Sequence, residues 1–363
     1  MRSHILPGVI QLARLVHRFL KRGSVGSALA ATVADMQSSL GSLIRSHGGF
    51  FSRAEAIDCG ETDRTLANAR REGVIVRLRR GMYAPADIYE ASDDAGKHLL
   101  HARAAVSAQR GAVALSGRSA AALHGFALYQ KDLAVVHLVR LDHGAPRQAA
   151  RAKHHVVSQD IEDDLGVYDG IIAVSPERAV WEVACRSSLE GGVVTADSAL
   201  RHDPGLLEPI EELQDRFMHS PGSHQGKLAI KLADGRSESP GESVTRVQFH
   251  RYGIPTPRLQ YHVVDHGNLV GIADFYWDDH RHLGEFDGKI KYQKLLRPDE
   301  TASDCVFREK RREDAMRADF RGMTRFIWSD VMPQNARLTM AELAHALDQS
   351  YRLYVRGRTI IAS

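Results

Sequence analysis

The pattern of hydrophobic and polar positions first indicates two short helices near the amino terminus. Leu40, Leu43 and Ile44 recur at helical spacing until a glycine pair, which predicts the end of a first helix. Ser52 and Glu55 then have the spacing of a capping box, in which each side chain satisfies the other's free backbone N–H group. The sequence therefore predicts a second helix beginning after Ser52.

A third helix and a β-hairpin follow directly. Thr62 caps a predicted helix over residues 63–72, which directs Leu66 toward a core. Residues 74–83 alternate in the manner of a hairpin and hold Arg79, Arg80 and a glycine at the turn. The order of helix, helix, turn, helix and hairpin predicts a winged helix-turn-helix.

The side chains predicted to face outward from this module are of types that bind DNA. Arginine pairs with phosphates, and arginine or asparagine contacts purine edges in the major groove. The third helix would enter the groove and the hairpin would contact the backbone. A small helical domain used for protein contact is the alternative. The predicted DNA-binding residues are Arg64, Asn68, Arg71, Arg79 and Arg80.

The central part of the chain mixes predicted helices and strands and therefore favours an α+β unit. A catalytic nucleophile with a histidine base could be sought among Ser116, Ser119 and His124. No G-x-S-x-G turn or orienting acid accompanies these residues, however. We interpret them as capping serines and a helix-packing histidine. The acidic run 162–164 is interpreted as a solvated turn.

A second hairpin near the carboxyl terminus carries an unusual number of acids. A β-rich run to Trp277 is broken by polar residues and resumes at Leu283. Side chains alternate along a strand, so Glu285, Asp287 and Lys289 share one face. With Asp274 on the preceding strand, three carboxylates would repel one another unless a cation were present, and Mg²⁺ prefers carboxylate oxygens.

The flanking elements complete a regular order. An amphipathic helix from Glu242 to Arg251 and a strand from Leu259 to Val264 precede the hairpin, and a helix and a strand follow it. His280 and His282 lie at the hairpin turn without a third metal ligand at fixed spacing. Basic residues after the hairpin indicate a phosphate track or a solvated helix face: Lys291, Lys294, Arg297, Lys310, Arg311, Arg312 and Arg317.

Composition narrows the choice of function. The formal net charge is only +3, so nucleic-acid binding would depend on local basic patches. The three cysteines lack CxxC spacing, which argues against a structural zinc site and a disulfide framework. Basic residues interrupt the apolar positions of the first 35 residues, so we expect a basic amphipathic extension or an upstream start codon. We expect a protein of the bacterial cytoplasm that does not enter the membrane.

The carboxyl-terminal pattern resembles the PD-(D/E)XK nuclease superfamily. Asp274, ten intervening residues and Glu285-Phe-Asp-Gly-Lys289 are closest to its Vsr-like branch. That resemblance implies a restriction-endonuclease-like α-β-β-β-α-β core that hydrolyses DNA with Mg²⁺ or Mn²⁺. Asp274, Glu285 and Asp287 would hold the metal, Lys289 would orient water or touch phosphate, and Glu242 would add a further acid. The Glu-x-Asp form departs from the acid-x-Lys triplet of the superfamily.

The amino-terminal stretch FSRAEAIDCGETDRTLANARREGVIVRLRRGMYAP resembles AbiEi-type antitoxins of type IV toxin-antitoxin systems. The middle segment resembles the part that follows it in such proteins. This resemblance implies an autoregulating DNA-binding module and a cognate nucleotidyltransferase-like toxin as partner.

Together these patterns predict a multidomain α+β or α/β protein of five segments. They are an extension (1–35), a winged helix-turn-helix (36–95), a mixed middle domain (96–201), linker helices (202–236) and a nuclease-like domain (237–363). The predicted function is an AbiEi-like DNA-binding protein carrying a Mg²⁺-dependent endonuclease domain. The alternative is a non-enzymatic antitoxin or transcriptional repressor with a degenerate nuclease fold.

Overall fold

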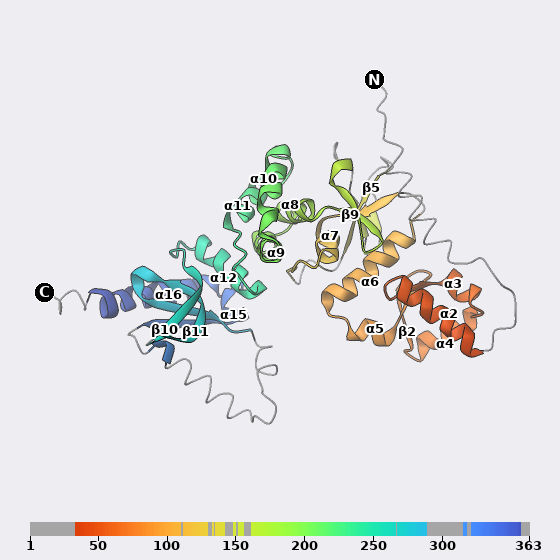
Figure 1. Cartoon of the computed structure of the whole chain (residues 1–363), viewed down its shortest axis with the longest axis horizontal. Coiled ribbons are helices and arrows are strands. Elements are labelled where there is room, and N and C mark those ends of the chain that lie inside the picture. Colours follow the sequence, from red (N-terminus) through yellow and green to blue (C-terminus); the bar gives the residue numbers. More distant parts are fainter. Residues whose placement is uncertain are drawn as a thin grey trace, which may run out of the picture. The chain divides into compact units, whose positions relative to one another are not determined.

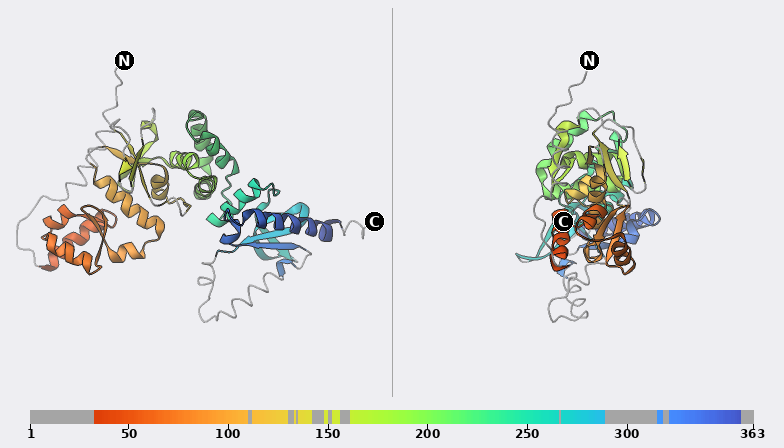
Figure 2. Two further views of the ribbon diagram at one scale, coloured as in Figure 1. Left: turned by 180° about the vertical axis from the view of Figure 1, so that it is seen from behind. Right: turned by 90° about the vertical axis from the view of Figure 1, so that its right-hand side faces the viewer.

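The computed structural model describes residues 33–109, 112–129, 133, 135–141, 148–149, 152–155, 161–265, 267–288, 315–317 and 321–356. The chain forms two compact units. The first combines Met1–Ser187 with Gly205–Lys227, and the second combines Ser188–Pro204 with Leu228–Ser363. Figures 1 and 2 show both units, and each is described by itself below.

The first unit begins with helices around a small sheet (Figure 1). The sheet order is β1-β3-β2, and all its pairs are antiparallel. Phe51 on β1 and Leu66 on α4 belong to one buried cluster that joins the helices to the sheet. The elements are α2 (Val33–Ser46), β1 (Phe51–Ser52), α3 (Arg53–Asp58), α4 (Asp63–Arg71), β2 (Ile75–Arg79), β3 (Met82–Pro85), α5 (Ala86–Ala91) and α6 (Asp94–Ser107).

Local hydrogen bonds fix the ends of these helices as the sequence predicts. Ser52 and Glu55 form a reciprocal capping box at α3, with the Ser52 N–H donating to the Glu55 carboxylate at 2.7 Å. Thr62 and Thr65 form the equivalent arrangement at α4. Gly81 lies in the β2–β3 turn with φ +76°, a conformation that glycine adopts without strain.

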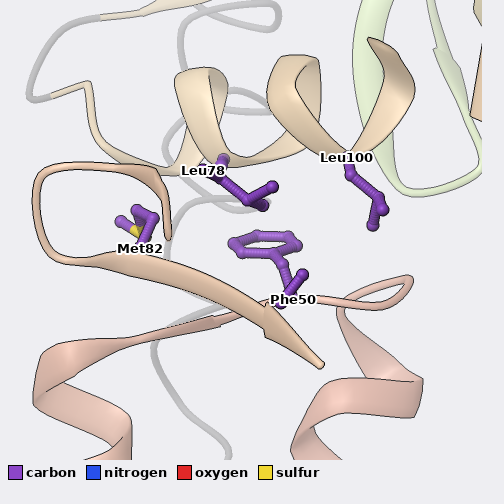
Figure 3. Packing of buried hydrophobic residues seen from close by; sticks show 6 residues of the cluster. Phe50, Leu78, Met82 and Leu100 are labelled. Carbon is purple, nitrogen blue, oxygen red and sulfur yellow. The ribbon is translucent and has the colours of Figure 1, made fainter. Parts of the chain in front are cut away.

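A second apolar cluster joins the hairpin to α6. Figure 3 shows Phe50, Leu78 and Met82 packed beside Leu100 of α6, and all four side chains are buried. The amino-terminal elements are therefore held against α6 by hydrophobic contact within the first unit.

A six-stranded mixed sheet forms the rest of the first unit, in the order β6-β7-β5-β4-β9-β8. Helices α7 and α8 pack against each other beside it. The elements are β4 (Val113–Leu115), α7 (Gly117–Leu123), β5 (Val136–Arg140), β6 (Gln148–Ala149), β7 (Ala152–His155), η2 (Glu162–Asp164), β8 (Leu165–Tyr168), β9 (Ile171–Val174), α8 (Pro176–Arg186), η3 (Pro204–Leu206), α10 (Leu207–Arg216) and α11 (Ser223–Leu232), whose residues after Lys227 belong to the second unit.

Asp164 corrects the interpretation of the acidic run as a solvated turn. Its side chain is 8% exposed and accepts hydrogen bonds from Arg178 and Arg216. Arg178 also pairs with Glu182 at 3.1 Å. The interpretation was wrong for Asp164 because its partners lie on α8 and α10, too far along the chain for a local charge pattern to reveal.

The second unit contains a four-stranded sheet in the order β10-β11-β12-β13. The first three strands are antiparallel, and β13 is parallel to β12. Residues 315–317, between β12 and β13, are helical. The elements are α9 (Leu189–His202), α12 (Pro240–Arg251), β10 (Arg258–Asp265), β11 (Asn268–Trp277), η4 (Asp278–His280), β12 (His282–Phe286), β13 (Gly322–Phe326), α15 (Trp328–Val331), α16 (Ala336–Ser350) and the π-helical turn η5 (Tyr351–Arg356).

The two faces of this sheet differ. Phe249 of α12 packs edge-on against Phe275 and Phe326, with ring centroids 5.1 and 5.7 Å apart, so α12 covers the face that these rings occupy. Helix α16 contacts both β13 and α12 (Figures 1 and 2). Tyr276 and Leu283 point to the opposite face and pack there with Met316.

These observations confirm a mixed α+β protein of more than one unit. Within the described residues, no helix has both the length and the apolar character needed to cross a membrane.

Candidate functional site

Helix α4 presents polar side chains on one outer face. Arg64, Asn68 and Arg71 are spaced by four and three residues and therefore lie on the same side of the helix. Arg64 and Arg71 are exposed, Asn68 is partly buried, and Leu66 is buried in the core. The helix thus offers two cations and one amide to a partner.

The β2–β3 turn adds further cations to the same group of elements, in which α4 contacts β2. Arg80 is exposed at the turn. Arg79 is partly buried, and burial lowers the pKa of its guanidinium from the ordinary value. An arginine keeps its charge at neutral pH, so both side chains remain available as cations.

Two further arginines of this region are absent from the predicted set. Arg70 on α4 and Arg77 on β2 are both exposed. The sequence shows that both residues are charged. The periodicity of the helix and the strand alone did not predict that both side chains would be exposed to a common binding partner. Arg53 differs from them, because its Nε donates to Asp63 at 2.6 Å.

Asp274 and Glu285 meet on the face of the second sheet opposite α12. The pairing of Phe275 with Gly284 places Asp274 across from Glu285 on the neighbouring strand. The N–H of Phe286 donates to Oδ2 of Asp274 at 2.7 Å. The structure therefore brings together two of the acids predicted from the sequence.

Glu285 has a cationic neighbour on the next strand. Arg325 is its register partner across the parallel β12–β13 pair, and Nη2 of Arg325 lies 3.3 Å from Oε2 of Glu285. The carboxylate side chain is 11% exposed and the arginine side chain 29%. The sequence gave no sign of this pairing, which links residues on either side of a long connection.

Glu242 lies at the start of α12 and is held by three donors. Its carboxylate accepts from the Glu238 N–H at 2.9 Å, the Ser239 hydroxyl at 2.7 Å and the Gln260 amide at 3.1 Å. Gln260 has a left-handed backbone with φ +50° inside β10, which is strained for a residue with a side chain. The strain accompanies the amide contact to Glu242, and no sequence pattern indicated it.

Asp287 follows Phe286, the last residue of β12. The Asp287 N–H donates to the Phe326 carbonyl at 2.7 Å, and its side chain is partly exposed. Lys289 lies outside the described residues. Of the basic residues predicted after the hairpin, Arg317 alone falls within the described part of the chain.

Two of the predicted metal ligands, Asp274 and Glu285, have partners within the protein. Among the residues whose placement is described, no three His, Cys, Asp or Glu side chains are arranged to hold one. Asp274 accepts a backbone hydrogen bond, and Glu285 faces a guanidinium. Both interactions use carboxylate oxygens that a metal ion would need.

The nearby histidine His282 has a structural role. It is buried and its two ring nitrogens contact the hydroxyls of Ser350 and Thr324, each at 2.8 Å. Burial is the main cause that lowers the pKa of His282, to about 4. The neutral His282 ring therefore bridges two hydroxyl groups and helps to hold β12 in the sheet.

Ser119 and His124 in the first unit are also structural. The Ser119 hydroxyl is fully buried 2.9 Å from Nε2 of His98, and Nε2 of His124 lies 2.8 Å from the Val174 carbonyl. A buried hydroxyl with these neighbours cannot reach a substrate in solution.

Comparison with known proteins finds relatives in mycobacteria. Residues 40–86 match the family described as "Transcriptional regulator, AbiEi antitoxin". The uncharacterized proteins MT2308 and Rv2248, from two strains of Mycobacterium tuberculosis, are each 30% identical over 219 residues. The match spans 60% of this chain and 75% of each relative.

One solved structure shows a weaker likeness. The crystal structure of the RV2827C protein from Mycobacterium tuberculosis is 19% identical and is matched over 63% of this chain and 85% of that chain. Its TM-score of 0.36 is too low to establish a shared overall fold.

Proposed function

This chain belongs to the same family as the two uncharacterized mycobacterial proteins and carries an AbiEi antitoxin region at residues 40–86, and we propose that it is a DNA-binding transcriptional regulator of the AbiEi type. The observation that carries the proposal is the cationic outer face of α4, together with the arginines of the β2–β3 turn in the same matched region. The matched residues 40–86 include both.

We propose that α2, α3, α4 and the β2–β3 hairpin act as a winged helix-turn-helix. Two capped helices precede a two-stranded wing, which supports this assignment. In this arrangement α4 enters the major groove, where Arg64, Asn68 and Arg71 reach base edges. Arg79 and Arg80 contact phosphates from the wing.

The proposed partners are operator DNA and a nucleotidyltransferase-like toxin, as the AbiEi resemblance implies. A cytoplasmic location and the five-segment organisation are further parts of the proposal. Autoregulation would require that the chain bind DNA upstream of its own coding sequence.

A binding assay with the full-length protein and labelled DNA from upstream of its gene would test this proposal. Fluorescence anisotropy at several salt concentrations should show binding that weakens as salt rises, because bound phosphates release counterions. An Arg64→Glu, Arg71→Glu variant should lose most of this affinity. A Lys231→Glu, Arg356→Glu variant, at exposed positions of the second unit, is the charge-matched control. Equal affinity of wild type and the α4 variant would refute the proposed interface.

A second candidate function is DNA cleavage by the carboxyl-terminal part. The order α12, β10, β11, β12 and a parallel β13 supports a restriction-endonuclease-like core. The meeting of Asp274 and Glu285 on neighbouring strands supports a nuclease site there. Mg²⁺ or Mn²⁺, if bound, would polarise the phosphate and activate water. The carboxylates of the chain would hold that metal, and its cationic side chains would orient the DNA phosphates.

A cleavage assay would test the second candidate function. Plasmid and linear DNA are incubated with the protein in the presence of Mg²⁺, Mn²⁺ or EDTA. Cleavage should require the metal and should be lost in Asp274→Ala and Asp287→Ala variants that retain wild-type folding. Unchanged nicking by either variant would exclude a nuclease site at these residues. Absence of cleavage by the wild type would leave the non-enzymatic regulator with a degenerate nuclease fold.

A further inference from the structure

Helix α16 carries a stripe of small and charged residues on its outer side. The stripe consists of four exposed residues, spaced by four, three and four positions: Arg337, Ala341, Ala344 and Asp348. This spacing places them along one line of the helix. The two opposite charges lie at the two ends of the stripe, at equal distances from its centre, and the alanines lie between them.

The stripe lines one part of a surface pocket of about 520 Å³. The segment that follows α12 and the turn η5 line the rest, through residues that include Tyr252 and Tyr351. These two tyrosines are 37% and 43% exposed, so the pocket presents aromatic surface to solvent. Alanine side chains allow a second helix to approach to an interaxial distance of roughly 8 Å. The pocket therefore suits a helix laid along α16.

The two charges select both the partner and its direction. A helix laid along the stripe must bring an acid to Arg337 and a base to Asp348. A second copy of α16 in antiparallel orientation supplies both groups at the required separation, whereas a parallel copy would oppose like charges. Within one chain the two residues are eleven positions apart, or about 16 Å along the helix, so they do not reach each other.

Asp348 remains able to accept this contact. It pairs with Arg352 of its own chain at 2.7 Å, and both side chains of that pair are more than half exposed. A carboxylate has two oxygens and accepts from more than one donor. A second guanidinium from a partner chain would therefore add to this pair without displacing it.

We infer that two copies of the chain pair through this stripe, with α16 antiparallel to the same helix of the second copy. Arg337 then faces the partner's Asp348, and Ala341 faces the partner's Ala344. A two-fold axis through the centre of the stripe makes the contact isologous, so both chains use the same patch. The inference goes beyond the proposed function and agrees with it, because helix-turn-helix regulators that bind as dimers contact two half-sites of a palindromic operator.

Sedimentation velocity of the full-length proteins in the absence of DNA would test this pairing. We expect the wild type to form a dimer that dissociates on dilution. Arg337→Glu alone or Asp348→Lys alone would oppose like charges twice across the axis, and each should weaken dimerisation at least about tenfold. An equimolar mixture of the two single variants should form heterodimers, and the double variant should recover the dimer, because both arrangements restore opposite charges across the interface.

Two further variants separate the pairing from general effects of charge and folding. Glu342→Lys is the matched control, because Glu342 is exposed on the same helix away from the stripe and its reversal should leave dimer affinity at the wild-type value. Ala344→Gln adds bulk at the centre of the stripe without a change of charge and should weaken the dimer. It replaces either charge variant if circular dichroism shows that variant to be unfolded.

A wild type that stays monomeric would overturn the inference and leave the pocket to a different partner. A dimer that both single charge reversals leave unchanged would overturn it as well. Failure of the mixture and of the double variant to recover the dimer would do the same, because recovery depends on a contact between chains.

Discussion

Asp197 on α9 and Arg246 on α12 form a buried ion pair, with Nη1 of the arginine 2.7 Å from Oδ2 of the aspartate. The Asp197 side chain is 1% exposed, and its other oxygen accepts from the Asp234 N–H at 2.7 Å. Burial raises the pKa of Asp197, and the charge of Arg246 opposes that shift. The pair ties α9 to the helix that carries Glu242.

Removing Arg246 should therefore destabilise the second unit strongly. We expect Arg246→Met to lower its unfolding free energy by about 3–5 kcal/mol, because Asp197 would be left as an uncompensated buried charge. Arg236→Met is the matched control, since that arginine is 64% exposed in its pair with Asp234 and should cost less than about 1 kcal/mol. Hydrogen exchange of the α9 and α12 amides measures both, and equal losses would contradict the prediction.

The α4 face and the wing should contribute differently to DNA binding. We expect Arg64→Ala or Arg71→Ala to weaken binding to the preferred sequence by roughly 1–3 kcal/mol if the residue reads a base. Arg79→Ala should lower affinity evenly across sequences and reduce the salt slope by about one. Anisotropy titrations against specific and scrambled DNA separate the two effects. A sequence-dependent loss in Arg79→Ala would reverse the assignment.

Gly241 should not tolerate a side chain. A Cβ at this position of α12 would overlap the ring of Phe286, whose N–H donates to Asp274. We expect Gly241→Ala to cost about 1–3 kcal/mol of unfolding free energy, and Phe286→Leu in the same chain to recover part of it. Gly41→Ala on α2 is the control, because a Cβ there meets only ordinary contacts and should be neutral or stabilising by up to about 1 kcal/mol. Thermal unfolding that ranks the two variants in the opposite order would refute this.

Acid should loosen β12 through His282. Its pKa is about 4 in the folded protein against an ordinary 6.5, so the unfolded chain binds the proton more readily between these values. The stability that neutral His282 contributes is complete above about pH 6.5 and falls toward pH 4, by up to about 1.4 kcal/mol per pH unit. Hydrogen exchange of β12 amides should show this slope, and His282→Gln should reduce it. An unchanged slope in His282→Gln, with His345→Gln as the exposed control, would assign the effect elsewhere.

The sequence by itself determined the local elements of this protein. The capping box at Ser52, the helix cap at Thr62, the glycine turn of the first hairpin and the alternation that directs Glu285 and Phe286 to opposite faces are all visible in short stretches. These features depend on hydrogen bonds and steric limits between residues a few positions apart. Because these interactions act between residues close together in the chain, the amino-acid sequence alone predicts them.

Only the tertiary structure decided which distant charges meet. Arg325 reaches Glu285 because β13 joins the sheet in parallel register, and Asp164 is buried because Arg178 and Arg216 converge on it. Asp197 likewise meets Arg246 because α9 packs on α12. Such pairs depend on how strands and helices are placed after the intervening chain has closed its loops, and residue spacing alone does not encode that placement.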